Sequence, residues 1–265
     1  MDPDSLARTI LAYRYLSAIS LVSTVWDHLL NLEHEVEVIW SNRREQYFLK
    51  AAFLIGRYGT HIALGYTTYI LSGAATLDDH VCKTWVWLFT IIGGASIAWG
   101  EFVVAQRIHA LWGYQRRIRY ILTGIYTVAF CALPFLVIFT CVQLQSKVMP
   151  LFNICVFVVK PMFSQWLIGL LSFLDVCVIS LTILNALDKP HRTNMDVLLA
   201  LHRDGLKFFV LLFVIRFSAL LMIVLGGLGD SFVLLPVMWA LSTTINSRLL
   251  LRVGKKQAPR IPISI

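Results

Sequence analysis

Four ionisable residues fall inside long apolar stretches of this sequence: Arg57, Glu101, Asp175 and Arg216. At bilayer depth an unpaired charge costs about 3 kcal/mol or more, so such residues usually face the interior of a helix bundle and mark ligand, ion or proton sites. Helices joined by short connections tend to pack as antiparallel neighbours. We therefore expect Arg57 to pair with Glu101, and Asp175 to pair with Arg216.

These charge pairs allow two interpretations. Either they only fix the register of the helices, or one carboxylate binds a ligand or moves a proton. The candidate charge network, which could bind a ligand, comprises Arg57, His61, Glu101, Asp175 and Arg216. If the protein is an enzyme, the candidate catalytic acids are Glu101, Asp175 and Asp27. A carboxylate paired with arginine is a poor acid, because the cation stabilises its charged form.

Seven apolar runs position these residues. They cover residues 8–31, 47–72, 84–112, 120–142, 163–187, 205–228 and 231–253. Each is long enough for a helix that crosses a hydrocarbon core about 30 Å thick. Only 14% of the residues are charged, whereas a soluble domain usually has about 25%. The sequence predicts an all-α membrane protein: one seven-transmembrane helix bundle over residues 1–253, followed by a short basic tail at 254–265.

The basic residues predict the orientation of the bundle. With the N-terminus outside, sixteen Lys and Arg residues lie in cytosolic segments or at cytosolic helix ends, and five lie outside. The outer five are Arg8, Arg14, Lys83, Lys147 and Lys160. Cytosolic loops carry an excess of positive charge, so we expect the C-terminus in the cytosol. We expect the protein in either the plasma membrane or the endoplasmic reticulum. Because the charges sit at helix ends, the net charge of +8 indicates lipid contact rather than nucleic-acid binding.

Two cysteines are placed to form a disulfide bond. Cys82 precedes the third apolar run and Cys155 lies in the segment between the fourth and fifth, so both face the outer, oxidising side. The alternative is a pair of free thiols, because sequence cannot show that their Cα atoms approach within about 7 Å. The third run also carries small residues, among them Gly93, Gly94 and Gly100, which favour a central helix in close contact with its neighbours.

Familiar catalytic motifs are missing from the sequence. It contains no HExxH zinc motif, P-loop, GxSxG nucleophile elbow or Asp-rich prenyl-diphosphate motif, so we expect no metal site and no cofactor. The seventh run contains no lysine that could hold retinal as a Schiff base, and neither an E/DRY triplet nor an NPxxY motif is present. The rhodopsin class of receptors is therefore not supported.

The first third of the chain resembles a known family. The stretches VWDHLL at 25–30, EVEVIW at 35–40 and GRY at 56–58, followed by RIHALWG at 107–113, resemble the motifs of the DUF6533 family of basidiomycete fungal membrane proteins. The resemblance implies a seven-helix fungal membrane protein but transfers no activity, since the family is uncharacterised. It also singles out Asp27, Glu35, Trp40 and Arg57. Trp26 departs from the family, in which tyrosine is common at that position.

Three functions compete. The first is a receptor-like bundle that binds a small apolar or prenylated ligand from outside and a cytosolic partner at basic loops near Arg116 and Arg192. The second is an intramembrane enzyme such as a terpene cyclase, in which a buried carboxylic acid protonates the substrate and aromatic side chains stabilise the cation. The third, a transporter, is disfavoured because no inverted repeat is evident.

Overall fold

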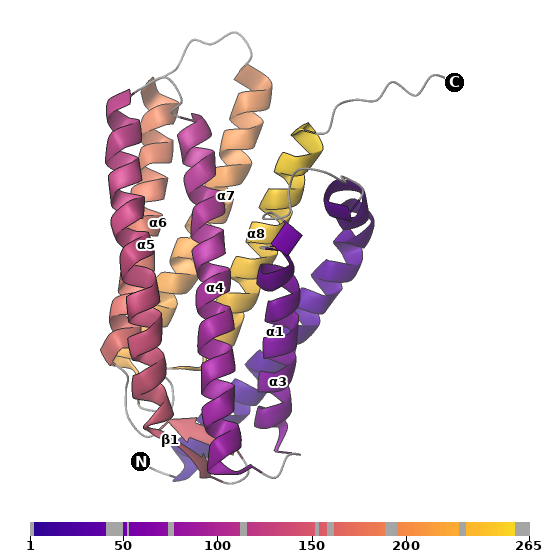
Figure 1. Ribbon diagram of the computed structural model, residues 1–265, viewed down its shortest axis with the longest axis vertical. Helices are drawn as coiled ribbons and strands as arrows, with labels where there is room; N and C mark the ends of the chain where they lie inside the picture. The colour runs from indigo at the N-terminus through magenta and orange to yellow at the C-terminus, as the bar shows by residue number, and fades with distance from the viewer. Residues whose placement is uncertain are drawn as a thin grey trace.

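The computed structural model describes residues 3–40, 50–51, 53–73, 77–111, 116–151, 154–157, 162–188, 195–227 and 232–257. These residues form seven α-helices, two short π-helical segments and one two-stranded β-hairpin. Figure 1 shows the long helices side by side along the longest axis of the molecule, with the start of the first helix and the end of the last helix toward opposite ends of the bundle. The helices are α1 (Pro3–Glu35), α3 (Thr60–Ser72), α4 (Asp79–Leu111), α5 (Arg116–Gln145), α6 (Met162–Asp188), α7 (Met195–Leu225) and α8 (Leu235–Gln257).

Four of these helices are long and apolar enough to cross a membrane. The qualifying segments are Asp79–Gln106, Tyr120–Gln145, Met162–Leu184 and Lys207–Leu225, from α4 to α7. The protein is therefore consistent with an integral, multi-pass membrane protein. Helix α3 has only 13 residues because it continues the π-helical segment η2 (Leu54–Gly59). Helix α1 carries two buried carboxylates, Asp27 and Glu35, near its C-terminal end.

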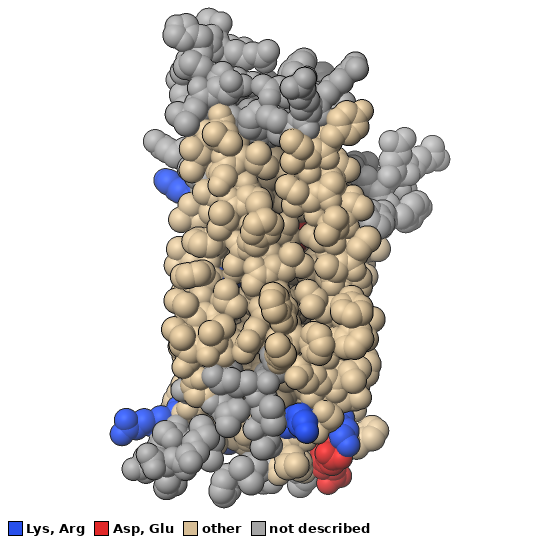
Figure 2. Space-filling view, turned by 90° about the vertical axis from the view of Figure 1, so that its left-hand side faces the viewer, with Lys and Arg blue, Asp and Glu red and all other residues tan. Residues whose placement is uncertain are grey.

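The outer surface of the bundle is apolar. Large hydrophobic side chains such as Val128, Phe135 and Trp166 are more than half exposed. Figure 2 shows one face covered by uncharged residues, with the visible charged groups toward its ends. Monomeric soluble proteins rarely expose apolar patches of such extent, so this surface fits a lipid environment.

Helix α4 lies at the centre of the bundle, as its small residues predict, and packs against α3, α5, α6, α8 and η2. A Cβ atom added to Gly94 would meet both γ-methyl groups of Val137 on α5 at 2.9 Å. One added to Gly100 would overlap the side-chain amide of Asn246 on α8. Glycine at these positions lets the neighbouring helices approach closely.

A β-hairpin closes one end of the bundle, a feature that the all-α prediction does not include. Strands β1 (Val148–Leu151) and β2 (Ile154–Phe157) pair in antiparallel register. Cys155 of β2 forms a disulfide bond with Cys82 of α4, and their Cα atoms are 5.6 Å apart. The pairing expected from the sequence is therefore present, and it holds the hairpin against the end of the central helix.

The start of α7 differs from the predicted apolar run. The run begins at residue 205, but the helix begins at Met195. The added stretch is rich in Leu and Ala, which favour helix, while its Asp, His and Arg residues lower its mean hydropathy. Hydropathy thus finds the membrane-facing part of this helix and not its polar extension. Residues 258–265 of the predicted tail lie outside the described residues.

Candidate functional site

Two clusters of buried charges and one apolar cavity make up the candidate site. In the central cluster, Nη1 of Arg216 on α7 donates hydrogen bonds to Oε1 of Glu101 on α4, at 2.7 Å, and to Oδ1 of Asp175 on α6, at 2.9 Å. All three side chains are buried. One guanidinium group thus holds carboxylates from two other helices.

The expected contact between Asp175 and Arg216 is present, but the expected pairing of Arg57 with Glu101 is wrong. Nη2 of Arg57 lies 3.6 Å from Oδ2 of Asp27, and its Nε lies 3.6 Å from Oε2 of Glu35. Arg57 lies in π-helical η2, whose wider turn changes the direction of side chains relative to a regular helix. The expected pairing rested on antiparallel packing of neighbouring helices, which applies equally to α1, the helix that carries Asp27 and Glu35.

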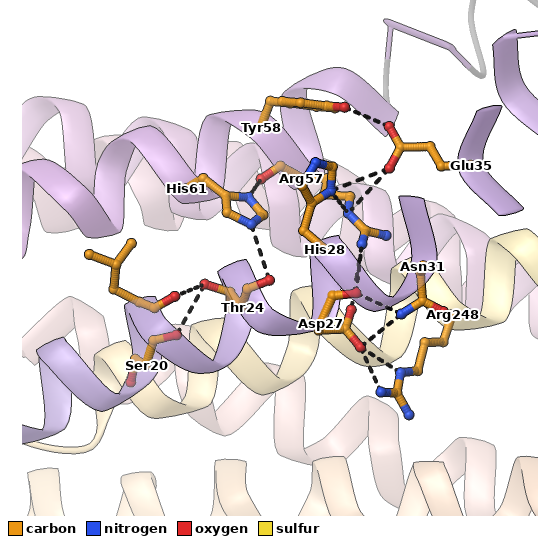
Figure 3. Close-up of polar contacts among 11 residues, drawn as sticks. Ser20, Thr24, Asp27, His28, Asn31, Glu35, Arg57, Tyr58, His61 and Arg248 are labelled. Atoms are coloured by element: carbon orange, nitrogen blue, oxygen red, sulfur yellow. Dashed lines mark hydrogen bonds and ion pairs between the residues drawn. The ribbon is translucent and has the colours of Figure 1, made fainter. Parts of the chain in front are cut away.

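The second cluster joins the end of α1 to η2 and α8 (Figure 3). Arg57 Nε donates to Nδ1 of His28 at 3.0 Å, and the Tyr58 hydroxyl donates to Oε1 of Glu35 at 2.7 Å. Arg248 of α8 donates from Nε to Oδ1 of Asp27 at 2.7 Å. Three separate segments of the chain are therefore tied through charge-assisted hydrogen bonds, which are stronger than neutral ones.

His61 extends this second cluster toward the middle of α1. Its Nδ1 lies 2.5 Å from the carbonyl oxygen of Arg57, and its Nε2 lies 3.2 Å from that of Thr24. A neutral imidazole donates through only one nitrogen, so one of these two contacts is a hydrogen bond in the neutral ring. The ring bridges the backbones of α1 and η2, as Figure 3 shows.

The predicted site residues therefore fall into two groups. Glu101, Asp175 and Arg216 meet in one cluster, and Asp27, Arg57 and His61 belong to the other. Sequence reasoning missed three members of the second cluster. These are His28, Tyr58 and Arg248. His28 and Tyr58 each directly follow a residue that the sequence motifs single out, whereas no motif marks Arg248 in the seventh apolar run.

An apolar cavity of about 80 Å³ lies beneath the hairpin. Helices α4, α5, α6 and α8 and strand β2 contribute to its wall, which includes Trp85, Phe89, Phe157 and Trp239. No carboxylate is among the described residues that line it. The disulfide-bonded hairpin thus contributes Phe157 to the wall of a cavity that suits an apolar occupant.

Two polar atoms in the cavity wall have no hydrogen-bond partner among the described residues. They are Oγ1 of Thr140 on α5 and Nε1 of Trp239 on α8, and both side chains are buried. A buried polar group without a partner costs about 1–3 kcal/mol. Neither atom is exposed to the cavity, whose surface is almost entirely apolar.

Most of the second cluster lies in a segment of the chain that matches a family model. Residues 15–62 match DUF6533, a family of unknown function. No curated protein matches the chain. The DUF6533 segment contains Asp27, His28, Glu35, Arg57 and Tyr58, so every member of the charged core except Arg248 comes from it. The DUF6533 match thus coincides with the cluster that joins α1, η2 and α8.

The second cluster contains equal numbers of carboxylates and guanidinium groups. Asp27 and Glu35 are matched in charge by Arg57 and Arg248. Among the described residues, no three His, Cys, Asp or Glu side chains converge as metal ligands. The geometry therefore supports helix positioning by this cluster, whereas the cavity beneath the hairpin offers space for a ligand.

Proposed function

We propose that this chain is a receptor-like membrane protein whose seven helices all cross the bilayer, and that it binds a small apolar ligand in the cavity beneath the hairpin. Its N-terminus lies outside and its C-terminus in the cytosol. The cavity carries the proposal, because it is apolar and lies at the hairpin end of the bundle, next to the Cys82–Cys155 bond. Disulfide bonds persist on the oxidising side of a membrane, so the cavity faces outward.

The volume of the cavity limits the size and shape of the ligand that it can bind. Pockets for drug-sized ligands usually have volumes of about 300–1,000 Å³, whereas this one has about 80 Å³. A slender alkyl or prenyl chain fits this space better than a polycyclic compound. The almost wholly apolar wall favours a chain whose polar end, such as a hydroxyl group, lies outside the cavity.

The proposed receptor also binds a partner protein on the cytosolic side of the membrane. Arg116 begins α5 at the end of the bundle opposite the hairpin, and Arg192 lies outside the described residues. These basic segments support docking of a cytosolic protein, with binding of the outer ligand altering the arrangement of α4 to α7. The resemblance to DUF6533 supports a fungal origin. The disulfide bond, which needs an oxidising compartment on one side, supports the plasma membrane or the endoplasmic reticulum as the site of action.

Thermal unfolding of the purified protein in lipid nanodiscs tests ligand binding. We expect some medium-chain alkyl or prenyl alcohols to raise the unfolding midpoint, since a ligand that binds only the folded state stabilises it. Gly93→Leu, which adds a side chain beside Trp239 in the cavity wall, should abolish the shift. Gly169→Leu adds the same side chain where no neighbouring atom lies within 4 Å, and should retain it. Equal shifts in both variants would contradict the proposal.

The alternative is an intramembrane enzyme such as a terpene cyclase. Glu101 and Asp175 each follow a cavity-lining residue, Ile97 and Leu171, by one helical turn. The short separation between each acid and the cavity favours the enzyme alternative. The hydrogen bonds of both acids to Arg216 disfavour it, as does the fact that neither acid lines the cavity. Asp27, the third candidate acid, belongs to the other cluster.

Incubation with prenylated epoxides tests the enzyme alternative. Membranes that contain the protein should form cyclised products if it is correct, and Asp175→Asn and Glu101→Gln should reduce product formation. Product that is unchanged in both variants, or no product at all, would exclude this chemistry for these residues.

A further inference from the structure

The central cluster carries one more negative charge than positive charge. Glu101 and Asp175 both accept hydrogen bonds from the same nitrogen of Arg216. The exposed fraction of each of the three side chains is below 10%. If both carboxylates were ionised, a net charge of −1 would be buried in the apolar interior, where ionised groups pair or become neutral.

The other groups around Asp175 do not offset this charge. Helix α6 packs against α4, α5 and α7. The groups that these helices present to the cluster are Glu101, the Tyr126 phenol and Arg216, and α6 itself adds the Cys177 thiol. Lys207, near the cytosolic end of α7, has an exposed side chain. Among the described residues, Arg216 is therefore the only cation that acts on Asp175.

Two polar atoms show where a neutralising proton fits. Oδ2 of Asp175 is buried and has no hydrogen-bond partner among the described residues. The hydroxyl oxygen of Tyr126, which lies close enough to both carboxylates to interact with their charges, is also buried and unpartnered. A proton on Oδ2 would neutralise the excess charge and leave Oδ1 to accept from Arg216.

We propose that the Glu101–Arg216–Asp175 cluster is a proton-binding site in the middle of the bundle, with Asp175 as the residue that carries the proton. The proposal rests on charge and hydrogen bonding and does not depend on a ligand. Ile97 and Leu171, which line the cavity, precede the two acids by four residues on their helices. The site therefore lies about 6 Å further along these helices, at 1.5 Å per residue. A change in the cavity that moved α4 or α6 would alter the contacts of the proton site.

Infrared spectroscopy of the full chain, purified in an ester-free detergent at neutral pH, tests this proposal. A protonated carboxyl group has a carbonyl stretching band that an ionised carboxylate lacks. We expect one such band, and we expect it to shift when the aspartates are labelled with ¹³C at the carboxyl carbon. Because this comparison uses only the wild-type sequence, it does not depend on whether a variant folds.

Three variants then locate the proton. Asp175→Asn should remove the band, and Glu101→Gln should also remove it, because an ionised Asp175 then balances Arg216 alone. Asp27→Asn, in the second cluster, should leave the band unchanged, because Asp27 is paired there with Arg57 and Arg248. A wild-type spectrum without the band, a band that shifts with labelled glutamate instead, or a band that persists in Asp175→Asn would overturn the assignment.

Discussion

At the residue scale, buried arginines determine how the helices are joined. Arg216 connects α4, α6 and α7 through two carboxylates, and Arg57 connects η2 to α1 through Asp27 and Glu35. Removing one partner of a buried pair costs about 3–5 kcal/mol, mainly because the remaining charge is left buried and unpaired. These two arginines are therefore expected to be among the least replaceable residues of the chain.

Replacing Arg57 by Gln should destabilise the protein strongly. Arg57 is 2% exposed, and its loss leaves Glu35 without its cationic partner. Arg248→Gln is the matched control, because the Arg248 side chain is 44% exposed and water can replace its contact with Asp27. Denaturant unfolding in detergent should show a loss of about 3–5 kcal/mol for Arg57→Gln and about 1 kcal/mol or less for Arg248→Gln. Equal losses would contradict the burial-based ranking.

A pair of double-mutant cycles distinguishes the observed pairing from the one expected from sequence. Glu101→Gln and Arg216→Gln should be strongly non-additive in unfolding free energy, by about 0.5–3 kcal/mol, since the two groups share a hydrogen bond of 2.7 Å. Glu101→Gln and Arg57→Gln should be additive within about 0.5 kcal/mol. Coupling in the second cycle and none in the first would contradict the observed pairing and would support the pairing of Arg57 with Glu101.

At the element scale, small residues of α4 allow the neighbouring helices to pack closely against it. The sequence predicts this helix and its central place, because its glycines are visible in the sequence and small side chains favour close packing. It does not predict the β-hairpin or the π-helical turns. Val148–Leu151 and Ile154–Phe157 are too short to show a clear strand periodicity. Hydropathy also cannot distinguish a π turn from an α turn, and packing between neighbouring helices does not choose between the carboxylates of α1 and α4 as partners of Arg57.

Gly94→Ala tests the contact between α4 and α5. The added Cβ would lie 2.9 Å from both γ-methyl groups of Val137, a side chain that is stiff about its Cα–Cβ bond. We expect a loss of about 1–3 kcal/mol in unfolding free energy, as for other overpacked cores. Gly124→Ala on α5 is the control, because no atom lies within 4 Å of its added Cβ. There the better helix propensity of Ala should leave stability unchanged or raise it by up to about 1 kcal/mol.

At the scale of the whole molecule, composition alone indicates the environment. Hydrophobic residues make up 58% of the chain, and four helices are long and apolar enough to cross a bilayer. The four charged residues inside apolar stretches were also visible in the sequence, but their partners were only partly predictable. Arg216 and Asp175 were paired correctly, whereas the contact between Arg248 and Asp27 joins residues 221 positions apart and required the three-dimensional arrangement.

The orientation can be measured by cysteine labelling in intact cells. A cysteine placed near residue 5 should react with a membrane-impermeant maleimide added outside, and one placed near residue 258 should react only after permeabilisation. The predicted result follows from the excess of basic residues on the cytosolic side. The control is a background that lacks the three free cysteines, Cys131, Cys141 and Cys177, but keeps the Cys82–Cys155 disulfide bond and has no added cysteine. External labelling near residue 258 would contradict a seven-span arrangement with the N-terminus outside.

Photolabelling tests the ligand cavity most directly. A diazirine-bearing medium-chain alcohol, activated in nanodiscs that contain the protein, should form adducts with cavity residues such as Trp85, Phe157 and Trp239. Peptide mass spectrometry should find these adducts reduced in Gly93→Leu and retained in Gly169→Leu. Adducts confined to lipid-facing side chains of α5 such as Val128 and Phe135, with the same yield in both variants, would contradict the account.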